Sequence, residues 1–300
     1  MVEPPQPAAR TPAPAPPIRP EYLRGVVAGS DLGIVPKPLT MVQRLINQGW
    51  LRKALILIVI ATGWELYARH LDNPLLVPTL SATIEALLAG TASGDLPQKV
   101  ANSLQLLLKG YTLGLAVALV LTTLAMMFRL GTDLLETLTA AFNPLPAIAL
   151  LPLALIWFGL GDRSIIFVLV HSVLWAVALN THSGFRSVSN TLRMVGRNYG
   201  LRGVAFTARI LIPAAFPSIL TGLKIGWAFA WRTLIAAELV FGVSSGKGGL
   251  GWYIYENKNM LDIPAVFAGL LTVILIGLVV ENVIFRNIEA ATVRRWGMQG

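Results

Sequence analysis

The sequence predicts an all-α membrane protein with about six transmembrane helices. Of the 300 residues, 55% are hydrophobic and only 13% are charged, and long stretches carry no Asp, Glu, Lys or Arg. Four such stretches are 111–128, 137–161, 164–185 and 263–280. A bilayer core of about 30 Å needs about 20 apolar residues per helix, so these stretches have the length of membrane spans. The absence of cysteine excludes disulfide scaffolds and thiolate-bound metals.

Six spans are expected within a transmembrane domain of residues 54–290. They cover about Ala54–Ala68, Leu107–Phe128, Leu134–Gly161, Ile165–Leu179, Pro217–Phe241 and Pro264–Ile284. Three prolines, Pro144, Pro146 and Pro152, interrupt the third span, and irregular backbone survives in a membrane only where protein buries it or water lines it. The third and fifth spans are therefore expected around a central pathway and dimer axis, with close packing at Gly222, Gly226, Ala228 and Ala230.

The two ends of the chain differ from its middle. Residues 1–38 predict a disordered Pro/Ala-rich tail, since eight prolines fall within the first 20 residues. Residues 39–53 have apolar side chains at helical spacing flanked by basic ones, which fits either an interfacial amphipathic helix or an extension of the first span. Residues 291–300 are expected to form a C-terminal tail.

The distribution of basic residues predicts the orientation in the membrane. With six spans both termini lie on one side; the segments on that side hold sixteen Lys and Arg, and the three other loops hold five. The positive-inside rule places both termini and the loop 181–216 in the cytoplasm. The same rule accounts for the net charge of +9, and no arginine-rich stripe with aromatics indicates nucleic-acid binding.

The loop 181–216 contains the most informative motif. Gly200 is followed ten residues later by Ile210 and then by Pro213. Asn190 can cap a helix, Gly200 can supply its left-handed end, and Pro213 can stop a second short helix. This arrangement resembles the loop signature of ABC-importer permeases, in which a helix and a glycine are followed by nine residues and Ile-x-Leu-Pro.

The resemblance extends from about Leu75 to Trp296 and is closest to permeases of the nitrate, sulfonate, taurine and bicarbonate importers. It includes residues 143–164, 210–240 and GKGGLGWYI at 246–254. It implies the type I permease fold in a bacterial inner membrane: a homodimer, two ATPase subunits on the cytoplasmic face, and a periplasmic or lipid-anchored substrate-binding protein. ATP and Mg would bind to the ATPase, so no cofactor, metal or catalytic residue is expected in this chain.

The resemblance also assigns the ATPase-coupling contact to this loop. The residues so assigned are Arg193, Met194, Arg197, Gly200, Ile210 and Pro213. Met194 stands where the family has an acidic residue, and Val195 and Gly196 replace two usual alanines. The departure at Met194 removes the basis for a specific salt bridge to the ATPase there.

Candidates for the translocation pathway are Arg232, Glu238, His171, Pro146 and Pro152, because charged and polar groups inside spans usually face a cavity or a partner. Arg232 lies about 12 Å deeper than Lys224, which can snorkel to the interface. Arg232 either provides positive potential for an anion or forms an ion pair, for example with Glu238 of the second copy.

The sequence thus predicts a permease subunit of an ATP-binding-cassette importer that moves a small anion such as a sulfonate, taurine or nitrate. A secondary transporter of a small organic anion is the alternative, although no clear inverted repeat is visible. An intramembrane enzyme is a third reading, for which no motif such as GxSxG or HExxH is present.

Overall fold

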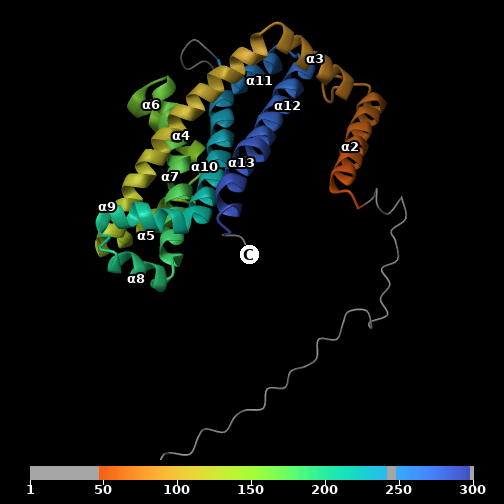
Figure 1. The fold of residues 1–300 in the computed structure, drawn as a ribbon. Coiled ribbons are helices and arrows are strands. Elements are labelled where there is room, and N and C mark those ends of the chain that lie inside the picture. The colour runs from red at the N-terminus through yellow and green to blue at the C-terminus, as the bar shows by residue number, and fades with distance from the viewer. Residues whose placement is uncertain (1–46, 242–247, 298–300) are drawn as a thin grey trace, which may run out of the picture. The chain divides into compact units, whose positions relative to one another are not determined.

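The computed structural model describes residues 47–241 and 248–297, and every regular element in these ranges is helical (Figure 1). Five helices are long and apolar enough to cross a membrane, and a bent pair provides a sixth candidate span. The five are α2 (Gly49–Leu71), α4 (Asp95–Met127), α7 (Asp162–Ser187), α10 (Ile212–Phe241) and α12 (Ile263–Val279). The predicted all-α membrane fold is confirmed.

The two ends of the chain differ in how much of them the structure describes. Residues 1–46, with the predicted tail and most of the segment 39–53, lie outside the described residues, and Gly49–Lys53 form the first turns of α2. At the other end, η4 (Val280–Phe285), α13 (Arg286–Glu289) and η5 (Ala290–Arg294) continue α12. Val293 is 1% exposed, so part of the segment expected as a C-terminal tail packs against α10.

Four short helices lie at the two ends of the helix bundle (Figure 1). At one end are α3 (Leu80–Ala92) and α11 (Leu250–Asn259), which pack against α12 and α4. At the other end are α8 (Asn190–Asn198) and α9 (Gly203–Phe206), within the loop 181–216.

The third span is broken as its prolines predict. α5 (Arg129–Phe142) is followed by a 3₁₀ turn, η2 (Ala147–Leu150), and by α6 (Leu151–Phe158), with a bend of 90° between the two arms. Pro144 and Pro146 lie in the break, where they cannot donate the hydrogen bonds that a continuous helix needs. Pro152 lies in the first turn of α6, where a missing N–H costs nothing, so it does not contribute to the break.

The central helix α7 packs tightly between α4 and α10. Each flanking helix presents a G-x-x-x-G pair to it: Gly110 and Gly114 on α4, Gly222 and Gly226 on α10. A Cβ added to any of these glycines would lie only 2.6–3.1 Å from a side chain of α7, so the backbones approach closely. Gly222 and Gly226, expected at a dimer axis, therefore pack inside their own chain.

The helix α10 is continuous with α9 through a π-helical segment, η3 (Thr207–Leu211). The expectation that Pro213 stops a short helix is wrong. Pro213 cannot donate to the carbonyl of Arg209, and the wider π turns just before it accommodate this loss. A single helical rod therefore runs from the loop 181–216 to Phe241.

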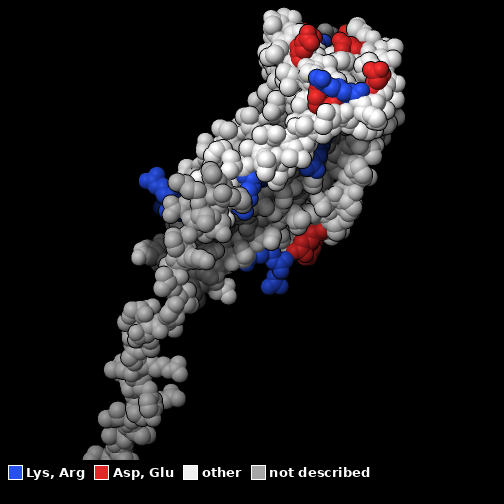
Figure 2. Space-filling model, turned by 90° about the vertical axis from the view of Figure 1, so that its right-hand side faces the viewer, with Lys and Arg blue, Asp and Glu red and all other residues white. Residues whose placement is uncertain are grey.

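Many apolar side chains on the outside of the bundle are exposed. On α12, Ile274, Leu275, Leu278 and Val279 are 44–57% exposed. Figure 2 shows a broad area with few charged side chains on one face of the described residues. An apolar surface of this extent is typical of helices that face lipid.

Replacing Gly114 by Ala should destabilise the helix bundle. The added Cβ would lie 2.8 Å from Val173 Cβ, and overpacking of this kind costs about 1–3 kcal/mol. The matched control is Gly63→Ala on α2, which has no neighbouring atom within 4 Å. Thermal unfolding in detergent should show a lower melting temperature for Gly114→Ala only; equal melting temperatures would contradict the close contact between α4 and α7.

Candidate functional site

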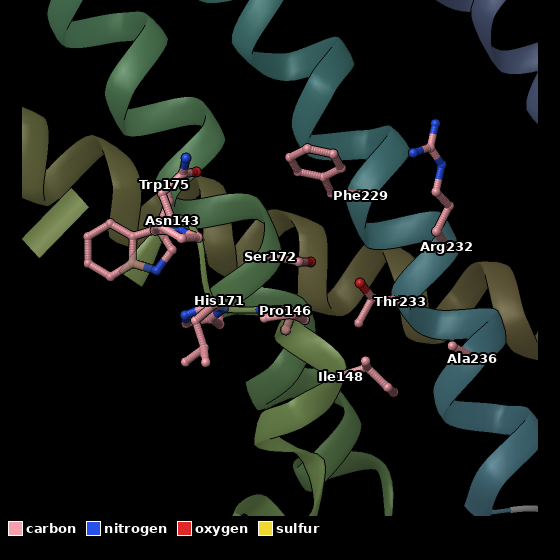
Figure 3. Close-up of a pocket in the computed structure, with 13 residues that line it drawn as sticks. Asn143, Pro146, Ile148, His171, Ser172, Trp175, Phe229, Arg232, Thr233 and Ala236 are labelled. Carbon is pink, nitrogen blue, oxygen red and sulfur yellow. The ribbon is translucent and has the colours of Figure 1, made fainter. Parts of the chain in front are cut away.

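A pocket of about 370 Å³ lies at the break in the third span (Figure 3). Its lining consists of the segment 143–148, of His171, Ser172 and Trp175 on α7, and of Phe229, Arg232, Thr233 and Ala236 on α10. Three residues that the sequence proposed for the pathway, Arg232, His171 and Pro146, thus line one pocket. Pro152 and Glu238 lie outside it.

Among the described residues that line this pocket, Arg232 is the only charged one. It is exposed, and within the described ranges it has no ion-pair partner. Figure 3 shows it on α10, with its guanidinium group directed away from His171 and Trp175. Lys224, two turns earlier on α10, differs in that its Nζ lies 2.7 Å from Glu289 Oε2. The arginine therefore contributes a positive charge that no carboxylate of the described residues neutralises.

Opposite α10, His171 and Trp175 form an aromatic cluster with Phe142. The rings of Phe142 and Trp175 stack at 5.5 Å, and the His171 and Trp175 rings are 6.1 Å apart. Both ring nitrogens of His171 and Nε1 of Trp175 are buried without a hydrogen-bond partner among the described residues. Such groups are rare in folded proteins and indicate a missing ligand, water or partner.

Glu238 is buried at the far end of α10, with 3% of its surface exposed. Ser103 Oγ of α4 lies 2.8 Å from both of its carboxylate oxygens, and the Gly251 N–H of α11 donates to Oε2 at 2.8 Å. The Leu250 N–H donates to Ser103 Oγ at 2.7 Å. This group, the Glu238 clasp, holds α4, α10 and α11 together and places a carboxylate at the positive N-terminus of α11.

The glycines before α11 make the clasp possible. A Cβ on Gly249 would overlap the Glu238 carboxylate, and one on Gly251 would lie 2.6 Å from Glu238 Cβ. The similarity of 246–254 to other permeases therefore has a packing reason at Gly249 and Gly251, while residues 242–247 lie outside the described ranges. Further along α11, burial raises the pKa of Tyr253.

Glu238→Gln should loosen α11. The neutral amide has one acceptor oxygen fewer and no negative charge at the positive N-terminus of α11, and hydrogen bonds to a charged group are about twice as strong as those between neutral groups. The control is Glu256→Gln, which removes only a surface ion pair with Lys99 at 3.6 Å. Limited proteolysis should cleave around α11 faster in the Glu238 variant alone; equal cleavage rates would mean that the clasp does not hold this helix.

In the loop 181–216, helix α8 is capped at both ends by residues next to it in the sequence. Ser189, not Asn190, is the N-cap, and its hydroxyl accepts from the Leu192 N–H. At the other end Gly200 has φ +76°, as predicted, and donates to the Arg197 carbonyl at 2.9 Å, while Leu201 donates to Gly196 at 3.1 Å. This pair of bonds is a Schellman motif.

Some of the residues proposed for coupling face inward. Arg193 donates from Nε to the Val188 carbonyl at 3.1 Å and from Nη2 to the Phe185 carbonyl, which ties α8 to the end of α7. A Cβ on buried Gly196 would lie 2.9 Å from Ile210 Cγ1, so Ile210 packs beneath α8. These residues fix the position of α8.

The outer face of α8 remains open. Met194 is 57% exposed, and the side chain of Arg197 is also exposed. Tyr199, the C-cap residue directly after α8, is 82% exposed. These side chains are therefore available for contact with another protein.

Comparison with known proteins identifies the family. Residues 110–292 match the model of the binding-protein-dependent transport system inner membrane component. The chain belongs to this family. It is therefore a permease subunit of an ABC importer, and the alternative of a secondary transporter is not favoured.

Individual relatives are similar over most of the chain. A protein of Methanocaldococcus jannaschii named as an ABC transporter permease is 34% identical over 73% of this chain and 82% of its own. The taurine transport system permease protein of Escherichia coli is 28% identical over 75% of this chain and 82% of its own. The nitrate import permease protein of Synechocystis is 27% identical over 86% of this chain and 95% of its own. The resemblance inferred from the loop is confirmed.

The sequence analysis did not identify Trp175 in the pocket or Ser103 in the Glu238 clasp. Trp175 follows His171 by four positions on α7, a spacing that places both on one helix face and could have revealed the pair. Ser103 carried no such signal, because its partner Glu238 is 135 residues away.

Proposed function

We propose that this permease moves a small anion, such as a sulfonate, taurine or nitrate, through a pathway that includes the pocket at the broken third span. The single observation that carries this proposal is the unneutralised Arg232 in a pocket without carboxylates. An anion that leaves water loses several kcal/mol of solvation, and a fixed positive charge offsets part of that loss. The names of the taurine and nitrate relatives support the same substrate class.

The energy for transport would come from a separate ATPase that binds ATP and Mg. We place its contact at the outer face of α8, where Met194, Arg197 and Tyr199 are available. Arg193, Gly200 and Ile210 act by holding α8 in position, and the rod from α9 to α10 connects this face to the pocket.

We also propose the other subunits of the importer and the orientation of the permease in the membrane. Two copies of the permease would form the channel, with both termini and the ATPases in the cytoplasm and the substrate-binding protein on the opposite face near α3 and α11. The basic residues of the loop 181–216 support this orientation. Because Glu238 is satisfied within its own chain, the geometry favours a pathway role for Arg232 over an ion pair with Glu238 of the second copy.

Arg232→Gln should reduce ATP-driven uptake in proteoliposomes on the order of tenfold, equivalent to about 1.4 kcal/mol. Arg232→Lys should retain part of the uptake, because the positive charge remains. The exposed Arg286, outside the pocket, provides the control Arg286→Gln, which should transport normally. If Arg232→Gln transports normally, or fails to assemble until Glu238→Gln is added, the pathway role is wrong.

Met194→Ser and Tyr199→Ser should each lower retention of the ATPase during purification without changing the melting temperature of the permease, since both side chains are exposed. The control is Leu160→Ser, which is 79% exposed just beyond α6. Retention is measured as the ratio of the two subunits after size-exclusion chromatography. Unchanged ratios in both α8 variants would exclude this face as the docking surface.

A further inference from the structure

The pocket at the broken third span has the composition of a ligand site. About 370 Å³ is within the range of small-molecule pockets, and its walls are mostly apolar. Figure 3 shows Phe229, Thr233 and Ile148 around the space between α7 and α10, with Ser172 on the facing helix. A nitrate ion has only four heavy atoms and would leave most of these apolar walls uncovered.

The charge in the lining of the pocket is positive. Arg232 is the one ionised side chain in the lining, and no Asp or Glu is present there. A ligand ammonium group would lose its hydration without gaining a counter-charge. These features favour an anion without an amino group.

Two residues of the lining, His171 and Trp175, have buried nitrogen atoms without a hydrogen-bond partner within the described residues. These atoms are Nδ1 and Nε2 of His171 and Nε1 of Trp175. Indole is a donor only, and a neutral imidazole has one N–H. A buried donor without a partner is unfavourable, so an acceptor that reaches these groups is favoured. Because these atoms are buried, a ligand in the pocket meets them only after the rings turn toward it.

We propose that this pocket is a substrate subsite of the permease itself, selective for an organic oxyanion with an apolar body and no amino group. The oxyanion head accepts hydrogen bonds from His171 and Trp175, and the apolar body lies against Phe229 and Ile148. Arg232 on the opposite wall adds positive potential without a direct ion pair. The inference rests on the proposed function, adds a site to it, and narrows its substrate class to sulfonates and similar organic anions, leaving out taurine and nitrate.

The test is direct binding to the permease–ATPase complex in nanodiscs, without binding protein or nucleotide, by isothermal titration. The probes are pentane-1-sulfonate, 5-aminopentane-1-sulfonate and nitrate. Pentane-1-sulfonate should bind with an affinity about tenfold or more above the other two. Equal affinities for the three probes would overturn the proposed selectivity.

The variants His171→Phe and Trp175→Phe keep an aromatic ring and remove the donors. Each should weaken pentane-1-sulfonate binding about tenfold, whereas Trp157→Phe on α6, outside the pocket, should not. Arg232→Gln, a change of an exposed side chain, should also weaken binding and reduce its dependence on salt. Co-purification with the ATPase and the melting temperature verify folding; if one α7 variant misfolds, the other and Arg232→Gln decide. Unchanged affinity in folded variants would refute the subsite.

Uptake separates this inference from the proposed function. If a loaded binding protein drives ATP-dependent anion uptake but pentane-1-sulfonate does not bind the nanodisc complex, the subsite is wrong and the proposed function stands. If no anion is taken up with any loaded binding protein, the proposed function itself fails.

Discussion

The close packing of α7 between α4 and α10 is the contact on which the rest of the described transmembrane region depends. Between helices in lipid the hydrophobic effect is small, so association relies on van der Waals contact and on small residues that let backbones approach. Gly110 and Gly114 on one side and Gly222 and Gly226 on the other provide this approach. The pocket, the Glu238 clasp and the loop 181–216 are all attached to one of these three helices, so their positions follow from this packing.

The break in the third span shows how an irregular backbone is kept inside a membrane protein. Pro144 and Pro146 prevent a continuous helix, and η2 lies against α7 and α10. An unpaired backbone in lipid would be costly, and cover by protein removes that cost. The same irregularity leaves space beside the helices, and this space is the pocket. Local disruption and a candidate site therefore have a common cause.

The rod formed by α9, η3 and α10 joins the two ends of the molecule. It carries Ile210 beneath α8, Arg232 at the pocket and Glu238 in the clasp. A continuous helix transmits displacement along its axis, and this rod includes the π-helical segment η3 just before Pro213. This geometry gives a physical route between the face proposed for the ATPase and the opposite end, where α11 is held by a buried carboxylate.

The sequence by itself determined the features that depend on neighbours along the chain: the apolar spans, the proline break, the left-handed Gly200 and the basic loop that indicated the family. It also selected Arg232, His171 and Pro146, which the structure brings into one pocket. Only the tertiary structure decided that Gly222 and Gly226 pack on α7, that Arg193 faces inward, and that Glu238 pairs with Ser103. Periodicity and capping are local, whereas these contacts join residues from different helices, and their geometry exists only after the helices have packed.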